Sequence, residues 1–166
     1  TPELVQENTH VSPVGTFETG YHLSADLADR AIQFIADHSA QRPDLPWLTW
    51  VAFGACHAPH QAPRDMIDAY DSMFVTGWDV EREVRLATQI QMGLVPAGTR
   101  LPPRNASVKA WDEHSLDEQR LFTRLQSAYA AMLEHADLQI GRIVAFLDTL
   151  AHVRAELVAP FLAVLL

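Results

Sequence analysis

Two histidines near the middle of the chain, His57 and His60, have the side chains best suited to chemistry. An imidazole can donate a hydrogen bond to an anion or transfer a proton near neutral pH. His57 and His60 flank Pro59 and follow Cys56, the one cysteine of the sequence. We therefore take His57 as the candidate site residue, with the role of contacting an anion or carrying a proton.

Other interpretations of these residues stay open. The spacing of His57 and His60 matches half of a metal site, but a metal needs further ligands, which the sequence does not identify. Both histidines could instead be structural residues of a loop, which Pro59 favours over a helix. A nucleophile formed by Cys56 with His57 is disfavoured, because adjacent side chains point apart. We expect Cys56 to be buried and inert.

A nearly continuous apolar run, residues 47–53, comes immediately before the histidines. Only Thr49 is polar there, and the other residues are aromatic, aliphatic or β-branched. This composition predicts a strand buried on both faces of a parallel sheet, with its two tryptophans in the core. Pro59 and Pro63 cannot continue such a strand. Ligands of open α/β sheets bind beyond the carboxyl ends of strands, where His57 would lie.

Helices are predicted around this strand. The expected helices cover residues 25–38 with Ser24 as the N-cap, residues 64–70, and residues 79–92, with residues 1–23 as a connector and an extended loop from Gly93 to Asp112. The helix over 79–92 carries Val80, Val84 and Ala87 at helical spacing and is expected to be mainly exposed.

The C-terminal part of the sequence has one long helical pattern. Ser115 and Glu118 form the Ser-x-x-Glu sequence of a capping box. The apolar periodicity that follows predicts one helix of about 33 residues, with a bend at Gly141 as an option. The tail over 151–166 is almost entirely apolar, and a second buried strand over 157–165 is an option that Pro160 fits poorly.

Composition excludes several classes of function. The 166 residues suffice for one ordinary domain. The net charge is −9 and Lys109 is the single lysine, which argues against nucleic-acid binding. The lone cysteine excludes an internal disulfide and a multi-cysteine zinc site. No apolar run is long enough to span a membrane. Because the sequence starts at Thr1, we expect it to be processed or cut from a longer chain.

Four segments, in order, resemble bacterial arylsulfatases of the alkaline-phosphatase-like superfamily. They are residues 20–31, beginning Gly20-Tyr21-His22-Leu23, residues 54–63 around His57, residues 101–105 followed by 110–112, and residues 129–137, beginning Tyr129-Ala130-Ala131-Met132. The resemblance implies an α/β fold, a partial alkaline-phosphatase-like sandwich that is mostly helical in this segment, with the strand over 47–53. It implies that residues 1–150 are the central part of a sulfatase catalytic domain and that 151–166 are a divergent tail.

The same resemblance implies hydrolysis of small-molecule sulfate esters. In the family, a formylglycine made from Cys or Ser in a Cys/Ser-x-Pro-x-Arg motif acts with a divalent cation, usually Ca²⁺, held by Asp and Asn. His57 matches the family's active-site histidine, which hydrogen-bonds the sulfate near the leaving oxygen and stabilises charge there. His60 is a candidate for a supporting position behind it. The resemblance is to bacterial proteins, and the sequence leaves the compartment, periplasm or cytoplasm, open.

The sequence departs from the family at the nucleophile and the metal site. Cys56 is followed by His57-Ala58-Pro59 and so does not fit Cys-x-Pro-x-Arg, and no serine fits either. The family's paired aspartates, Gly-Lys-x-His segment and Asp-Asn pair are absent. We therefore expect this chain to hold neither Ca²⁺ nor a formylglycine, to be inactive alone, and to self-associate through apolar faces. The alternatives are a non-catalytic helical interaction domain, or a phosphodiesterase or phosphonate hydrolase of the same superfamily.

Overall fold

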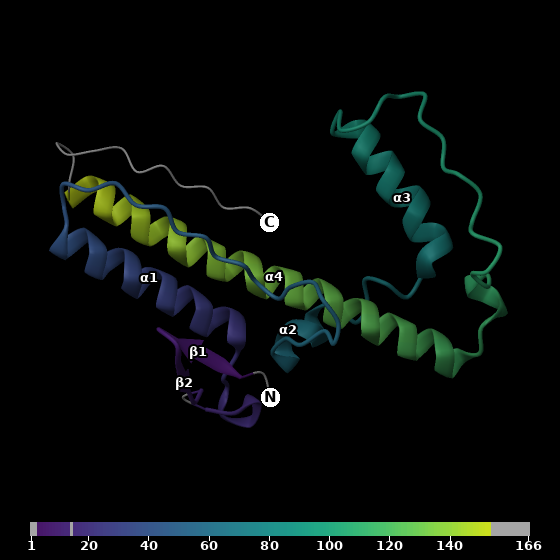
Figure 1. Cartoon of the computed structure of the whole chain (residues 1–166). Coiled ribbons are helices and arrows are strands. Elements are labelled where there is room, and N and C mark those ends of the chain that lie inside the picture. The colour runs from purple at the N-terminus through teal and green to yellow at the C-terminus, as the bar shows by residue number, and fades with distance from the viewer. Residues whose placement is uncertain (1–2, 14, 154–166) are drawn as a thin grey trace. The chain divides into compact units, whose positions relative to one another are not determined.

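The computed structural model describes residues 3–13 and 15–153, which form mostly helices (Figure 1). The elements are β1 (Leu4–Gln6), β2 (Thr9–Val11), α1 (Leu23–Gln41), α2 (Arg64–Ala69), α3 (Gly77–Gln91) and α4 (Leu116–Val153), with 3₁₀ turns at Phe17–Thr19 and Trp111–Glu113. The chain divides into two compact units. The first comprises Thr1–Pro59 with Met132–Leu166, and the second comprises His60–Ala131.

A small hairpin begins the first unit. β1 pairs antiparallel with β2, with Leu4 opposite Val11. The turn residues Glu7 and Asn8 have φ values of 50° and 64°. Positive φ values at both positions give a two-residue hairpin turn a twist that matches the twist of its strands. The prediction of a mere connector over residues 1–23 was therefore wrong for this part.

The core of the first unit lies between α1 and the C-terminal part of α4, which run side by side (Figure 1). Ala28 and Ala31 of α1 and Ile143 of α4 are its buried centre. The small alanine side chains let the two helices approach closely, and Arg142 of α4 donates a hydrogen bond to Asp29 of α1. These contacts join residues that are far apart in the sequence into one helical pair.

The start of α1 differs from the prediction. The helix begins at Leu23, and the N-cap is His22, whose Nδ1 accepts a hydrogen bond of 3.2 Å from the backbone N–H of Ser24. Ser24 is itself buried inside the first turn. An imidazole nitrogen thus takes the role that the sequence had assigned to the serine hydroxyl.

Residues 47–53 do not form the predicted strand. Among the residues that the structure describes, β1 and β2 make the sheet, and 47–53 form an unpaired extended segment. Val51 and Phe53 pack against the Ala28 cluster, whereas Leu48 is 75% and Trp50 is 72% exposed. The prediction of burial on both faces was wrong because only one face meets helices. The second strand suggested for 157–165 lies outside the described residues.

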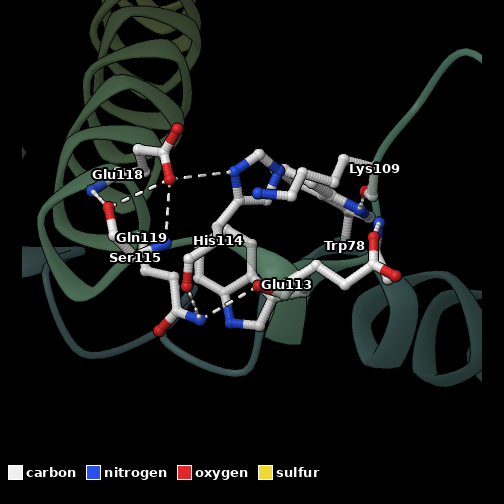
Figure 2. A network of polar contacts seen from close by, with 9 residues as sticks. Trp78, Lys109, Glu113, His114, Ser115, Glu118 and Gln119 are labelled. Carbon is white, nitrogen blue, oxygen red and sulfur yellow. Dashed lines mark hydrogen bonds and ion pairs between the residues drawn. The ribbon is translucent and has the colours of Figure 1, made fainter.

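The helices predicted for the second unit are confirmed, with small shifts at their ends. α2 and α3 lie where helices over 64–70 and 79–92 were expected, and α4 is longer than predicted, at 38 residues. The capping box is also confirmed. The Ser115 N–H donates to Glu118 Oε2 at 2.8 Å, and the Glu118 N–H donates to Ser115 Oγ at 3.3 Å (Figure 2). Within residues 3–13 and 15–153, no helix has the length and apolar character to cross a membrane.

Candidate functional site

His57 lies exposed on the loop that follows the extended segment. Its backbone N–H donates to the Gly54 carbonyl at 2.9 Å, which closes a turn. Its ring Nδ1 lies 2.6 Å from the Ala58 carbonyl oxygen. A carbonyl oxygen only accepts hydrogen bonds, so Nδ1 must carry the hydrogen. The ring is therefore oriented through Nδ1, and in the described part of the chain no other group hydrogen-bonds Nε2.

This orientation limits what His57 Nε2 can do. In a neutral ring protonated at Nδ1, Nε2 is a hydrogen-bond acceptor. In the imidazolium, both ring nitrogens donate, so Nε2–H can bind an anion while Nδ1–H stays on Ala58. The hydrogen bond to Ala58 thus leaves Nε2 as the ring nitrogen that can take a further partner, as an acceptor in the neutral ring and as a donor in the imidazolium.

The other residues singled out by the sequence have different surroundings. Cys56 is a free thiol that is half-buried, so the expectation of full burial was wrong. His57 belongs to the first unit and His60 to the second. The His60 ring is half-buried and stands edge-on to Tyr129, with 5.1 Å between ring centroids. His60 also lines a cavity of the second unit.

That cavity has a volume of about 370 Å³ and lies between α3 and α4. Five residues of α3 line it at helical spacing, and the α4 residues that line it also lie on one face. The lining side chains are Trp78, Glu81, Arg82 and Arg85 of α3, Phe122, Thr123, Leu125, Gln126 and Tyr129 of α4, and His60, Phe74 and Trp111 from the connecting segments, with Gly77 at the start of α3. Glu81 and Arg82 of α3 are thus half-buried at the cavity, and Arg85 lines it while remaining exposed.

The apolar stripe of α3 is correspondingly exposed. Val80 is 46% and Val84 is 54% exposed. The sequence had predicted a mainly exposed helix, which is confirmed, but it gave no sign that arginines rather than valines would face a cavity.

The first residues of α3 fix one wall of the cavity. Asp79 Oδ2 accepts from the Trp111 N–H at 2.9 Å, and Asp79 Oδ1 accepts from Arg104 Nη1 at 2.8 Å. These hydrogen bonds, first that of Trp111 and then that of Arg104, lower the pKa of Asp79. Trp78 Nε1 donates to the Lys109 carbonyl at 3.2 Å (Figure 2). The segment before α4 is thereby held on α3.

A cluster around His114 holds the same wall from the α4 side (Figure 2). The His114 ring stands edge-to-face with Trp78 and with Phe122, at centroid distances of 5.2 and 5.0 Å. Its Nδ1 is 3.5 Å from Glu118 Oε2. Gln119 Nε2 donates to the carbonyls of Trp111 and His114 at 2.9 and 3.2 Å. The sequence analysis did not predict this arrangement. The sequence signal that could have indicated it is the run Gly77-Trp78-Asp79.

A second pair of histidines lies in the first unit. The rings of His22 and His135 are 3.9 Å apart between centroids. His135 is 8% exposed, and its Nδ1 has no hydrogen-bond partner among the described residues. Burial, and then the proximity of His22, lower the pKa of His135. Both effects disfavour the charged form of the His135 ring inside the unit.

Acidic and histidine side chains do not gather into a metal centre in the described ranges. Within residues 3–13 and 15–153, no group of three or more His, Cys, Asp or Glu side chains could hold a metal ion. Several of the aspartates are committed to arginines instead, for example Asp68 and Asp71 to Arg124 at 2.7 and 2.6 Å. These residues do not fit the Ca²⁺ site that the resemblance implies.

Comparison with known proteins agrees with the resemblance seen in the sequence. A family profile described as Sulfatase matches residues 2–154. An uncharacterized sulfatase of Schizosaccharomyces pombe is 35% identical over 105 residues, covering 63% of this chain and 19% of that protein. An arylsulfatase of Klebsiella aerogenes is 29% identical over 145 residues, covering 80% of this chain and 31% of that protein. The chain therefore spans less than a third of the length of either relative.

Proposed function

The chain belongs to the sulfatase family, and we propose that it is an internal segment of a sulfuric ester hydrolase of the arylsulfatase type. The observation that carries this proposal is the family match over residues 2–154. Because the chain covers 31% or less of its relatives, sulfate-ester hydrolysis is proposed for the whole protein and not for this segment alone.

In that protein, His57 would be the residue of this segment that contacts the sulfate group. The hydrogen bond of Nδ1–H to Ala58 holds the ring, and the imidazolium Nε2–H would donate to the ester oxygen on the leaving side. As the bond from sulfur to that oxygen breaks, the oxygen gains negative charge, which the imidazolium stabilises and can neutralise by giving up its proton. His60 would act from a supporting position.

We place the family's other catalytic groups outside this chain. Pro59 lies one position too late for Cys56 to fit the formylglycine motif. The described residues also offer no group of three ligands for a cation. The segment would thus contribute a positioned histidine, while the nucleophile and the Ca²⁺ site would come from the rest of the protein.

The isolated chain provides the first test. The purified 166-residue chain would be incubated with 4-nitrophenyl sulfate and added Ca²⁺, and release of 4-nitrophenolate would be followed. We expect no turnover. Turnover that disappears in a His57→Ala variant would show that the nucleophile lies within this chain, and the proposal would fail.

The whole protein that contains this segment provides the second test. Replacing His57 by Ala should lower kcat by about 10²–10⁴, the usual contribution of a general acid. The loss should grow as the leaving alcohol becomes less acidic, because poorer leaving groups need more protonation. The His60→Ala variant should show a smaller decrease in kcat. The His10→Ala variant, which changes an exposed residue of β2, should show no decrease. An unchanged kcat in His57→Ala would contradict the assigned role. Faster hydrolysis of aryl phosphate diesters than of aryl sulfates would favour the phosphodiesterase alternative.

A further inference from the structure

We propose that the cavity of the second unit binds an aromatic carboxylate, with its ring between the aromatic walls and its carboxylate on Arg85. This inference does not rest on the proposed hydrolase function, because it concerns residues within His60–Ala131 alone. Nothing about His57 or sulfate enters it.

The cavity has the size and the walls of a small-molecule site. Its volume of about 370 Å³ falls in the range of roughly 300–1,000 Å³ typical of ligand pockets. Six rings line it, those of His60, Phe74, Trp78, Trp111, Phe122 and Tyr129. Such walls bind a flat apolar ring by stacked or edge-on contacts.

These walls are braced before any ligand arrives. The Trp78 ring stands edge-on to Trp111 at 4.9 Å and packs at 5.5 Å on Phe122. The Trp78 indole N–H is bound to Lys109, and the Trp111 N–H is bound to Asp79. Little side-chain ordering is left for binding to induce, which favours affinity.

The charge inside the cavity selects the sign of the ligand. Arg82 and Arg85 contribute two positive charges and Glu81 one negative charge. Glu81 Oε1 accepts from Thr76 at 2.9 Å, and Arg82 Nη2 donates to the Pro102 carbonyl at 2.7 Å. In the described part of the chain, Arg85 makes no hydrogen bond or ion pair, so its guanidinium is available. The cavity thus carries one excess positive charge in a chain of net charge −9.

The shape of the guanidinium selects the kind of anion. Its parallel N–H groups match the two oxygens of a planar carboxylate, which can bind in a bidentate manner. Gln126, at the same cavity, adds an amide that can donate to a third polar atom. A cationic ligand would gain from the aromatic rings but would meet two guanidinium groups, so it is disfavoured.

The test is a titration followed at the tryptophan indoles. The full 166-residue chain, labelled with ¹⁵N at tryptophan, would be titrated with 2-naphthoate. We expect the Nε1–H resonances of Trp78 and Trp111 to shift in a saturable manner and those of Trp47 and Trp50 to stay, with assignments from single Trp→Phe variants. The neutral isostere 2-naphthamide should bind at least tenfold more weakly. Absence of a saturable shift at Trp78 and Trp111 would overturn the proposal.

A matched pair of variants isolates the carboxylate contact. Arg85→Gln should weaken the binding of 2-naphthoate at least tenfold and leave the binding of 2-naphthamide unchanged. Unchanged binding of 2-naphthamide would also show that the cavity is intact in this variant. Arg100→Gln removes an exposed arginine that does not line the cavity and should change neither ligand. Equal binding of naphthoate and naphthamide, an unchanged affinity for naphthoate in Arg85→Gln, or tighter binding of benzyltrimethylammonium would each overturn the proposal.

Discussion

Gly77 lies so close to Trp111 that a Cβ on the glycine would stand 2.0 Å from Cδ2 of the indole. Gly77 also has a φ of +75°, a conformation that disfavours any side chain. Two separate requirements for glycine therefore meet at the residue that begins α3. The close approach puts Trp111 in the cavity wall, beside Trp78.

Replacing Gly77 by Ala should destabilise the second unit strongly. The left-handed backbone conformation costs about 1–2 kcal/mol for a residue with a side chain. Displacing Trp111 adds about 1–3 kcal/mol of overpacking. We expect a loss of roughly 2–5 kcal/mol in the free energy of unfolding, measured by urea denaturation with tryptophan fluorescence.

Gly93→Ala is the matched control for that change. Gly93 follows the C-terminal end of α3 with a φ of +72°, and nothing lies within 4 Å of the point that a Cβ on this glycine would occupy. The free energy of unfolding of Gly93→Ala should therefore fall only by the cost of the left-handed backbone conformation, about 1–2 kcal/mol. Equal losses in the two variants would show that contact with Trp111 contributes nothing.

Asp79→Asn should loosen the segment held on α3. The amide keeps one acceptor oxygen for the Trp111 N–H but loses the charge that pairs with Arg104. Hydrogen exchange of the Trp111 amide should become faster, whereas the exposed Asp44→Asn should leave it unchanged.

The lowered pKa of Asp79 also predicts a dependence on pH. The unfolded chain takes up the proton at a higher pH than the folded chain does, so this stabilisation is present above the ordinary value of 3.8 and is lost as the pH falls through the folded pKa. Urea midpoints between pH 5 and pH 2 should fall less steeply in Asp79→Asn than in the parent chain. Parallel profiles would contradict this.

His135 should make the first unit sensitive to mild acid. Its pKa is lowered from 6.5, so as the pH falls through 6.5 the unfolded chain takes up a proton before the buried ring does. Stability should therefore fall as the pH drops from about 7 toward 5. In His135→Gln this decline should be smaller, whereas His10→Gln, which changes an exposed histidine, should keep it. A decline of unchanged size in His135→Gln would refute the assignment.

The exposed side of residues 47–53 should drive self-association of the isolated chain. Leu48 and Trp50 offer large apolar side chains beside an unpaired backbone. The double variant Leu48→Ser and Trp50→Ser should sediment as a smaller species, and Gln33→Ser, which changes an exposed polar residue of α1, should not. Unchanged association of the double variant would place the contact elsewhere. A compact, cooperatively unfolding dimer would favour the interaction-domain alternative.

Local features of this fold could be predicted from the sequence, because they depend on neighbouring residues. The Ser115–Glu118 capping box and the periodic apolar pattern specify α4 almost to its first residue. The hairpin escaped prediction because its strands are short and its turn uses Glu7 and Asn8 rather than glycine. The cap of α1 was assigned to Ser24 because hydroxyls cap helices more often than imidazoles such as that of His22 do.

Features that depend on distant partners could not be predicted. The composition of residues 47–53 predicted a buried strand, but pairing requires a neighbouring strand, which composition does not specify. The orientation of α3 was equally hidden. The sequence predicted a mainly exposed helix without indicating which of its faces borders the second unit. Trp78 and Asp79 contact a segment about thirty residues later, and Arg85 lines the cavity on the same side of the helix.

The half-buried Cys56 gives experimenters direct access to the histidine loop. Because it is the one thiol of the sequence, a fluorophore or spin label attached there carries no background from other positions. Its neighbour in the sequence is His57, so the label reports on the loop in which the carbonyl of Ala58 orients the His57 ring. Spectroscopy of that loop thus needs no engineered attachment point.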